Sequence, residues 1–425
     1  MEKFIVKGGY QLKGKITPSG NKNEALPVLA AVLLTDQPVT LHNLPNIGDI
    51  NQLKQILEGL GVSISYKGDS SYQFDSSQLL SFEPDKTLSS AIRGSFLLAA
   101  PLLARFHQAK VFVPGGDAIG KRRLDTHLEA MQQLGVTIKS ENDGFLLKCK
   151  KLKGTDILLD EASVMATENI VMTAVMAEGT TTIYHAACEP HVQGLCRMLN
   201  MMGAKIDGIG SNFLKIEGVE SLSGGDHHIQ PDHTEIGSLI GLAAVTHSEI
   251  TIEKPGFHNF PQILRYFERL GVKVKQVGED MLIPAEQELE IKTDIDQSIP
   301  KIDDAPWPAF PADLTSIMTV VATQSKGTVL IFEKMFESRL FWVDKLISMG
   351  AKIILCDPHR AVVNGPAKLR GGILTSPDIR AGMALLIAAL CAEGTSEIYN
   401  IQQIDRGYEK IDERLNQLGA KIQRV

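Results

Sequence analysis

One pattern of apolar and polar positions occurs six times along the chain. In each copy, apolar residues at helical spacing are followed by a glycine and then by alternating apolar and polar residues. This order predicts a helix that ends at a C′ glycine and leads into a strand. The six phrases are LEGLGVSI, MQQLGVTI, LNMMGAKI, FERLGVKV, LISMGAKI and LNQLGAKI. Their glycines, 68 to 79 residues apart, are Gly61, Gly135, Gly203, Gly271, Gly350 and Gly419.

A second helix, almost entirely apolar, is predicted upstream of each glycine phrase. VMAEGTTTIYHA, VATQSKGTVLIF and LCAEGTSEIYNI are the clearest transitions from that helix into a strand. Each repeat is therefore expected to be a βαβαββ module of roughly 70 residues, longer than the repeats of about 20–50 residues that build solenoids. At 425 residues the chain also exceeds one ordinary core. We expect an α/β fold of two compact domains with three repeats each.

The chain is expected to cross between the two domains twice. Its N-terminal segment is predicted to contain strands but no helix. The last repeat ends soon after Gly419 without matching strands, so the N-terminal strands are expected to complete it. This closure places residues 22–230 in the first domain and residues 1–21 and 231–425 in the second.

Composition and charge exclude several classes of protein. Hydrophobic residues make up 44% of the chain and charged residues 22%, which is typical of a soluble globular protein. The net charge of −7 disfavours a general nucleic-acid binder. Five scattered cysteines without a CxxC pair suggest neither a disulfide framework nor a metal site. Without a signal-peptide pattern or an apolar run of membrane-spanning length, the expectation is a cytoplasmic protein with no membrane partner.

Three cations fall at the predicted starts of equivalent apolar helices. They are Lys22, Arg93 and Arg380. A cation at a helix N-terminus opposes the helix dipole and costs about 0.3–1 kcal/mol. A bound anion would reverse that cost, because helix N-termini and cations attract it together. These positions therefore predict an anionic ligand, held in a cleft between the domains if these helix ends face inward.

Other polar residues near the helix starts allow two interpretations. Asp232 and Ser376 are expected to be N-caps. Asp313, which follows the proline-rich segment DDAPWPAFPA, is either a cap or a carboxylate that acts as a general base at the cleft. Arg339 and Arg406 follow the second strands of their repeats and join the set of candidate cleft residues.

The most strongly charged stretch is Pro114–His127, PGGDAIGKRRLDTH. It combines a Pro-Gly-Gly turn with three consecutive cations, two carboxylates and an imidazole. One interpretation is a solvated surface loop. The other is an active-site loop in which Arg122 binds an anion and Asp117 moves a proton.

The motifs as a set resemble one enzyme family. The six repeats, SGNKNEALP, the helix at Arg93, PGGDAIGKRRLDTH, PAFPAD, FESR, PDIRAG and IDRGYE are similar, from end to end, to the UDP-N-acetylglucosamine 1-carboxyvinyltransferases, the enolpyruvyl transferases of peptidoglycan synthesis. The resemblance implies a two-domain inside-out α/β barrel, with three βαβαββ units per domain and the substrates between the domains. It also implies a role in cell-wall formation, and so in cell shape and division.

The family reaction transfers the enolpyruvyl group of phosphoenolpyruvate to the 3′-hydroxyl of the sugar nucleotide and releases phosphate, with no cofactor. It proceeds by addition and elimination through a tetrahedral intermediate. By resemblance, Lys22, Arg122 and Arg406 hold phosphoenolpyruvate, with Asn23 beside Lys22. Asp313 is the base at the 3′-hydroxyl, and Arg339 and Arg380 support the closed cleft. The residues implied to meet the sugar nucleotide are Arg93, Arg122, Asp125, Ser163, Val164 and the backbone around Met335. The resemblance implies small-molecule substrates as the partners and leaves the oligomeric state open.

Three positions depart from the family pattern. Asp117 stands where most members have the cysteine of PGGC, which is the proton donor and the residue that fosfomycin alkylates. A carboxylic acid can donate that proton if its pKa is raised, but it is a poorer nucleophile than a thiolate, so fosfomycin is expected to fail. Met165 replaces a glycine beside the uridine contacts. Arg123 replaces a proline and could exchange roles with Arg122.

Three alternative functions remain from the sequence. The shikimate-3-phosphate enzyme of the same superfamily would show a lysine-serine pair where this chain has NKNEALP. A paralogue could use another nucleotide sugar, given Met165. A catalytically idle homologue could bind UDP-sugars, although the complete set of charged candidates disfavours it.

Overall fold

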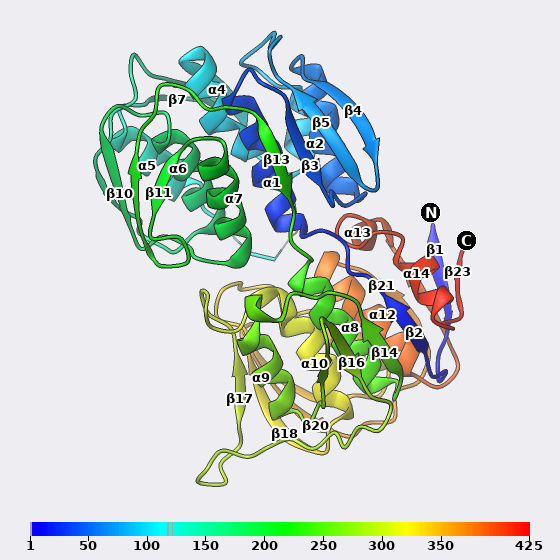
Figure 1. The fold of residues 1–425 in the computed structure, drawn as a ribbon. Coiled ribbons are helices and arrows are strands. Elements are labelled where there is room, and N and C mark those ends of the chain that lie inside the picture. Colours follow the sequence, from blue (N-terminus) through cyan, green and yellow to red (C-terminus); the bar gives the residue numbers. More distant parts are fainter. Residues whose placement is uncertain (1, 117–118, 121) are drawn as a thin grey trace. The chain divides into compact units, whose positions relative to one another are not determined.

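The computed structural model describes residues 2–116, 119–120 and 122–425. The chain divides into two compact units, whose elements are labelled in Figure 1. Each unit has its own hydrophobic core. Unit 1 consists of Met1–Ser19, Asp117–Lys121 and Pro231–Val425, and unit 2 consists of Gly20–Gly116 and Arg122–Gln230.

Within the described residues the strands form six small sheets, one for each predicted repeat. Five of them have four strands, with one parallel pair and otherwise antiparallel neighbours. Unit 2 contains β13(Gly225–His228)-β3(Val39–His42)-β5(Ser71–Asp75)-β4(Ser63–Gly68), β6(Gln108–Phe112)-β8(Gly144–Lys148)-β7(Thr137–Glu141) and β11(Lys205–Asp207)-β12(Phe213–Glu217)-β10(Thr180–Tyr184)-β9(Asp156–Leu158). Unit 1 contains β15(Lys275–Val277)-β16(Asp280–Ile283)-β14(Glu249–Ile252)-β2(Lys13–Ile16), β17(Lys301–Asp303)-β18(Gly327–Phe332)-β20(Arg360–Gly365)-β19(Lys352–Asp357) and β21(Ile373–Thr375)-β22(Thr395–Tyr399)-β1(Lys3–Lys7)-β23(Ile422–Arg424).

The interior of unit 1 is made of three apolar helices, α8(His233–Val245), α10(Thr315–Gln324) and α12(Ile379–Cys391), which pack against one another (Figure 1). Every residue of α8 is buried, as expected for a helix that is apolar on all sides. A Cβ atom on Gly241 would lie 2.6 Å from a methyl carbon of Ile317, so glycine permits this close approach. The remaining helices are η3(Phe257–Asn259), α9(Pro261–Arg269), η4(Ala312–Leu314), α11(Val343–Ser348), α13(Gln402–Asp405) and α14(Ile411–Gln417).

Unit 2 is built in the same way. Its interior helices are α1(Lys22–Ala31), α4(Ala99–Phe106) and α6(Val164–Ala174), with the sheets outside them. The other helices are η1(Val32–Leu34), α2(Gly48–Gly59), α3(Lys86–Ala91), η2(Arg93–Leu98), α5(Asp125–Gln133) and α7(Pro190–Met201). The inside-out α/β fold and the βαβαββ repeat are therefore confirmed. All six helix-end glycines have φ between +82° and +107°, as the C′ position requires.

The N-terminal strands divide between two repeats. β1 completes the sheet of the sixth repeat, as predicted. β2 instead runs parallel to β14 in the fourth repeat, so the prediction for this strand is wrong. β13, which directly precedes the first helix of the fourth repeat, lies parallel to β3 in the first repeat. The place beside β14 is therefore taken by β2.

None of the helices in the described part of the chain combines the length and apolar character needed to cross a membrane. The same residues contain no cluster of three or more His, Cys, Asp or Glu side chains arranged to hold a metal ion.

Candidate functional site

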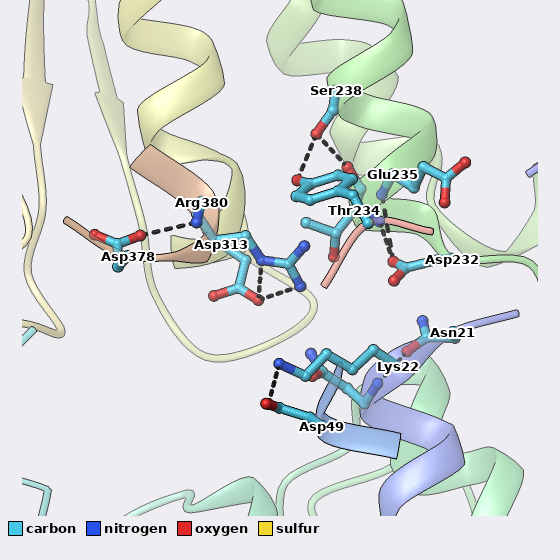
Figure 2. Close-up of polar contacts among 12 residues, drawn as sticks. Asn21, Lys22, Asp49, Asp232, Thr234, Glu235, Ser238, Asp313, Asp378 and Arg380 are labelled. Carbon is cyan, nitrogen blue, oxygen red and sulfur yellow. Dashed lines mark hydrogen bonds and ion pairs between the residues drawn. The ribbon is translucent and has the colours of Figure 1, made fainter. Parts of the chain in front are cut away.

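Lys22 is the first residue of α1, where the sequence predicted a cation. The Asn21 side chain caps this helix by accepting hydrogen bonds from the backbone N–H groups of Asn23 and Glu24, at 2.8 and 3.1 Å. The Lys22 ammonium lies 2.7 Å from a carboxylate oxygen of Asp49, at the start of α2 (Figure 2). Both side chains are less than 10% exposed. Asp49 was not predicted, and it offsets the charge that Lys22 places at a helix N-terminus.

Arg93 and Arg122 lie together at the start of η2. The Arg93 guanidinium donates to the backbone carbonyls of Arg122, at 3.3 Å, and Arg123, at 3.1 Å. Burial and the nearby Arg122 charge lower the pKa of Arg93 to about 10. At Gly116, with φ of +118°, a Cβ atom would lie 2.9 Å from an Arg122 guanidinium nitrogen. The glycine thus allows the Arg122 guanidinium to lie close to the backbone of Gly116. The two neighbouring cations, Arg93 and Arg122, form a site that favours binding of an anion.

Arg123 has a structural role of its own. Its guanidinium donates to Asp125 at 3.0 Å and to Asp160 at 2.9 Å, and these carboxylates raise its pKa. Asp160 also accepts a hydrogen bond from the Thr126 hydroxyl at 2.6 Å. Arg123 therefore ties the segment after Arg122 to the segment that leads into α6.

The N-terminus of α6 adds the next two predicted residues. Ser163 is its N-cap and accepts a long hydrogen bond, 3.5 Å, from the backbone N–H of Ala166. Val164 is the first residue of the helix, and Met165, the departure from the family pattern, follows it. Because Asp160 is three residues upstream, the Arg123 bridge brings Ser163 and Val164 to the same part of unit 2 as Asp125.

His127, the imidazole of the charged loop, belongs to the core. The amide nitrogen of Asn169 lies 3.0 Å from its Nδ1 and donates to the carbonyl of Phe96 at 3.1 Å. Burial, followed by the charge of Arg93, lowers the pKa of His127 to about 3. The ring is therefore uncharged at neutral pH.

Asp313 is the centre of the polar cluster in unit 1. It lies inside η4, and the N-cap residues of η4 and α10 are Pro311 and Leu314, so the interpretation of Asp313 as a helix cap is wrong. Its carboxylate instead accepts from Arg380 at 3.1 and 3.0 Å (Figure 2). It also accepts from Arg339 at 2.9 Å. Both arginines are almost fully buried, whereas the Asp313 side chain is 31% exposed. Two fixed guanidinium groups thus orient a carboxylate that solvent can still reach.

The caps of the neighbouring helices follow from local hydrogen bonding. Asp232 caps α8 as predicted, because it accepts from the backbone N–H groups of Thr234 and Glu235. The prediction for Ser376 is wrong: the cap of α12 is Asp378, and Ser376 donates to the Asp378 carbonyl at 3.0 Å. A carboxylate one residue before the helix reaches the first N–H groups directly, including that of Arg380 at 2.8 Å.

Met335 and Arg406 lie on two other segments of unit 1. The backbone N–H of Met335 donates to the fully buried Asp304 at 3.3 Å, and that of Lys334 donates to the same carboxylate. Arg406 is the C-cap residue of α13 and donates to the Gln403 side chain at 2.7 Å. Asp304 was not predicted, and it fixes the backbone around Met335.

Asp117, the candidate proton donor, lies outside the described residues. The following residues are described: the carbonyl of Ile119 accepts from the backbone N–H of Ser338 at 3.2 Å. A Cβ atom on Gly120 would lie 3.0 Å from the carboxylate of Glu337. This part of the charged loop therefore packs on the segment that carries Arg339.

Comparisons with known proteins agree with this architecture. The family described as EPSP synthase (3-phosphoshikimate 1-carboxyvinyltransferase) matches residues 6–415. A UDP-N-acetylglucosamine 1-carboxyvinyltransferase from Bacteroides fragilis is 54% identical, with all of both chains covered, and one from Bradyrhizobium diazoefficiens is 52% identical, with 99% of this chain and 98% of the relative covered. The solved structure of the enolpyruvyl transferase NikO from Streptomyces tendae has a TM-score of 0.89 at 25% identity, covering 100% of this chain and 99% of NikO. An EPSP synthase from Acinetobacter baumannii shares the fold, with a TM-score of 0.76 at 17% identity and full coverage of both chains. The chain therefore belongs to the enolpyruvyl transferase family, within its group of UDP-N-acetylglucosamine 1-carboxyvinyltransferases.

Proposed function

We propose that this protein transfers the enolpyruvyl group of phosphoenolpyruvate to the 3′-hydroxyl of UDP-N-acetylglucosamine. The observation that carries the proposal is the full-length identity of more than half of the residues to relatives named for this activity. The corresponding cellular role is the first committed step of peptidoglycan synthesis in the cytoplasm. Unit 2 corresponds to the first enolpyruvyl transferase domain, predicted at residues 22–230, and unit 1 corresponds to the second, predicted at residues 1–21 and 231–425.

The reaction has two steps with a balanced exchange of groups. In the addition, the 3′-oxygen bonds to C2 of phosphoenolpyruvate, the hydroxyl loses its proton, and the methylene carbon gains one. In the elimination, the new methyl group loses a proton and the C2–O bond to phosphate breaks. The products are the enolpyruvyl ether of the sugar nucleotide and inorganic phosphate. Both steps require cations at the phosphate and carboxylate, one base and one acid.

The ligands of phosphoenolpyruvate are assigned by the resemblance to the family. Lys22, Arg122 and Arg406 hold its phosphate and carboxylate, with Asn23 beside Lys22. The pair formed by Arg93 and Arg122 supports this assignment, because the repulsion between two half-buried cations is relieved when an anion binds. The residues assigned to the sugar nucleotide are Arg93, Arg122, Asp125, Ser163, Val164 and Met335.

Asp313 is assigned as the base for the 3′-hydroxyl, and Arg339 and Arg380 as the residues that orient it. The two ion pairs fix the direction of the carboxylate. The proton moves to it while the new C–O bond forms, because the hydroxyl becomes more acidic as that bond forms. Asp117 is assigned as the acid that protonates the methylene carbon.

The direct test is phosphate release from phosphoenolpyruvate in the presence of UDP-N-acetylglucosamine. We expect release that depends on both substrates, with formation of an enolpyruvyl ether detected by mass spectrometry. Release with another nucleotide sugar in place of UDP-N-acetylglucosamine would identify a paralogue with a different acceptor. Binding of UDP-N-acetylglucosamine without any release would identify a non-catalytic homologue.

The aspartate at position 117 gives a second prediction. Fosfomycin should leave the wild-type enzyme active, because a carboxylate attacks an epoxide poorly. Asp117→Cys should retain activity and be inactivated by fosfomycin, with one adduct per chain on that cysteine in the intact mass. The wild-type chain is the matched control, since it already has an exposed thiol at Cys356. An active but resistant Asp117→Cys variant would show that position 117 does not face the reacting carbon.

A further inference from the structure

Arg406 depends on its surroundings for its position. It follows α13, which has only four residues, and a helix of this length is not stable by itself in water. The hydrogen bond from Arg406 to Gln403 lies within the same short segment. The placement of α13 therefore contributes to the direction of the Arg406 guanidinium.

One end of this segment is held in the core. Tyr408, two residues after Arg406, is fully buried, and its hydroxyl lies 2.9 Å from the hydroxyl of Ser238 in α8. Gly407, which lies between Arg406 and Tyr408 in the chain, packs closely on Ile379. A Cβ atom on this glycine would lie 2.4 Å from a methyl carbon of Ile379. The segment after Arg406 is therefore fixed by packing.

Arg424, in strand β23, holds the residue just before Arg406 and a residue of α14. Its guanidinium donates to both carboxylate oxygens of Asp405, at 2.9 and 2.8 Å. It also donates to both oxygens of Asp412, at 3.2 and 3.1 Å, and lies 4.9 Å from the ring of Phe4. Bidentate pairing of this kind fixes orientation as well as charge.

The ion pair between Arg424 and Asp405 also affects the charge around Arg406. Asp405 is the neighbour of Arg406 in the chain, and a carboxylate released there would compete for the Arg406 guanidinium and repel an anionic ligand. Arg424 occupies both of its oxygens.

We propose that Arg424 is a positioning residue for Arg406: by binding Asp405 and Asp412 it fixes α13 and withholds the Asp405 carboxylate from the anion site. This inference rests on the proposed function, in which Arg406 binds phosphoenolpyruvate. Arg424 itself touches neither the substrate nor the reacting atoms.

The test is a comparison of steady-state kinetics. Arg424→Gln should raise KM for phosphoenolpyruvate about tenfold or more, the size expected for losing a charge-assisted hydrogen bond, while KM for the sugar nucleotide changes less than threefold. Adding Asp405→Asn to Arg424→Gln should recover at least a third of the loss, because the released carboxylate is then neutral. A purely structural role for Arg424 predicts instead that the KM values of both substrates change by similar factors, whether or not Asp405→Asn restores stability.

Two more variants complete the design. Arg424→Lys keeps the positive charge but cannot make the bidentate hydrogen bonds of the guanidinium. It should fold like the wild type and raise KM for phosphoenolpyruvate by a smaller factor than Arg424→Gln. Arg360→Gln removes an exposed arginine that pairs with Asp357, and it should change nothing. An unchanged KM in both position-424 variants, or no recovery with Asp405→Asn, overturns the inference. A wild-type enzyme that releases no phosphate overturns the proposed function instead.

Discussion

Asp313→Asn is expected to lower kcat by about 10²–10⁴, the usual contribution of a general base, with a much smaller change in either KM. The amide has the shape of the carboxylate but takes up a proton far less readily. Arg339 and Arg380 donate to different oxygens of Asp313, and an asparagine side chain has only one oxygen. The variant therefore loses the hydrogen bond to one of the two arginines. A lower melting temperature should therefore accompany the loss of turnover.

The matched control separates these two effects. Asp303 lies in the same unit and also pairs with two cations, Lys301 at 3.1 Å and Lys334 at 2.8 Å. Asp303→Asn should change stability without lowering kcat. If Asp313→Asn retains wild-type turnover, or if both variants lose it equally, Asp313 is an anchor for the two arginines and the base must be another group.

The fold could be predicted because its signals are local. A glycine at the end of each helix is required by one backbone conformation, and all six glycines adopt it. The burial of α8 and α12 was predicted from apolar residues on every side of the helix. The position of β2 was not predicted, because no local pattern shows that β13, just before α8, pairs with β3 and leaves the place beside β14 to β2.

In the candidate site, too, the features with a local signal in the sequence were predicted and their distant partners were not. The cations at the helix starts were found from the sequence, because Lys22, Arg93 and Arg380 stand where the helix dipole disfavours them. Their partners were not found. Asp49 is separated from Lys22 by a strand, and nothing in its own segment indicates which cation it meets. A search for carboxylates in the first turns of the second helices would have found it.

Glu24 was also missed, although it lies in the same turn as Lys22. Its buried carboxylate is 2.8 Å from Nε2 of His227 and accepts from the backbone N–H of Gln230 at 3.2 Å. A Cβ atom on Gly194 would lie 2.4 Å from that carboxyl group. The room for this glutamate comes from a glycine in α7, far away in the sequence, and so no local pattern reveals it.

Lys22→Met is expected to damage both stability and catalysis. The buried Asp49 would lose its ammonium partner, which typically costs about 3–5 kcal/mol of unfolding free energy. Loss of a cation from the phosphate should also lower kcat/KM for phosphoenolpyruvate by about 10²–10³, the range seen when one group that stabilises transition-state charge is removed. A single variant cannot separate these effects, because an unstable enzyme also loses activity.

The double variant Lys22→Met with Asp49→Asn separates them. Replacing the carboxylate by an amide removes the buried charge, so most of the lost unfolding free energy should return, as measured by urea denaturation. The activity should not return, because the phosphate still has no ammonium at this position. Asp49→Asn alone is the control, and it should keep Lys22 available to the substrate. Recovery of both stability and activity in the double variant would mean that Lys22 serves only to neutralise Asp49, and the anion would then have to be held by the arginines alone.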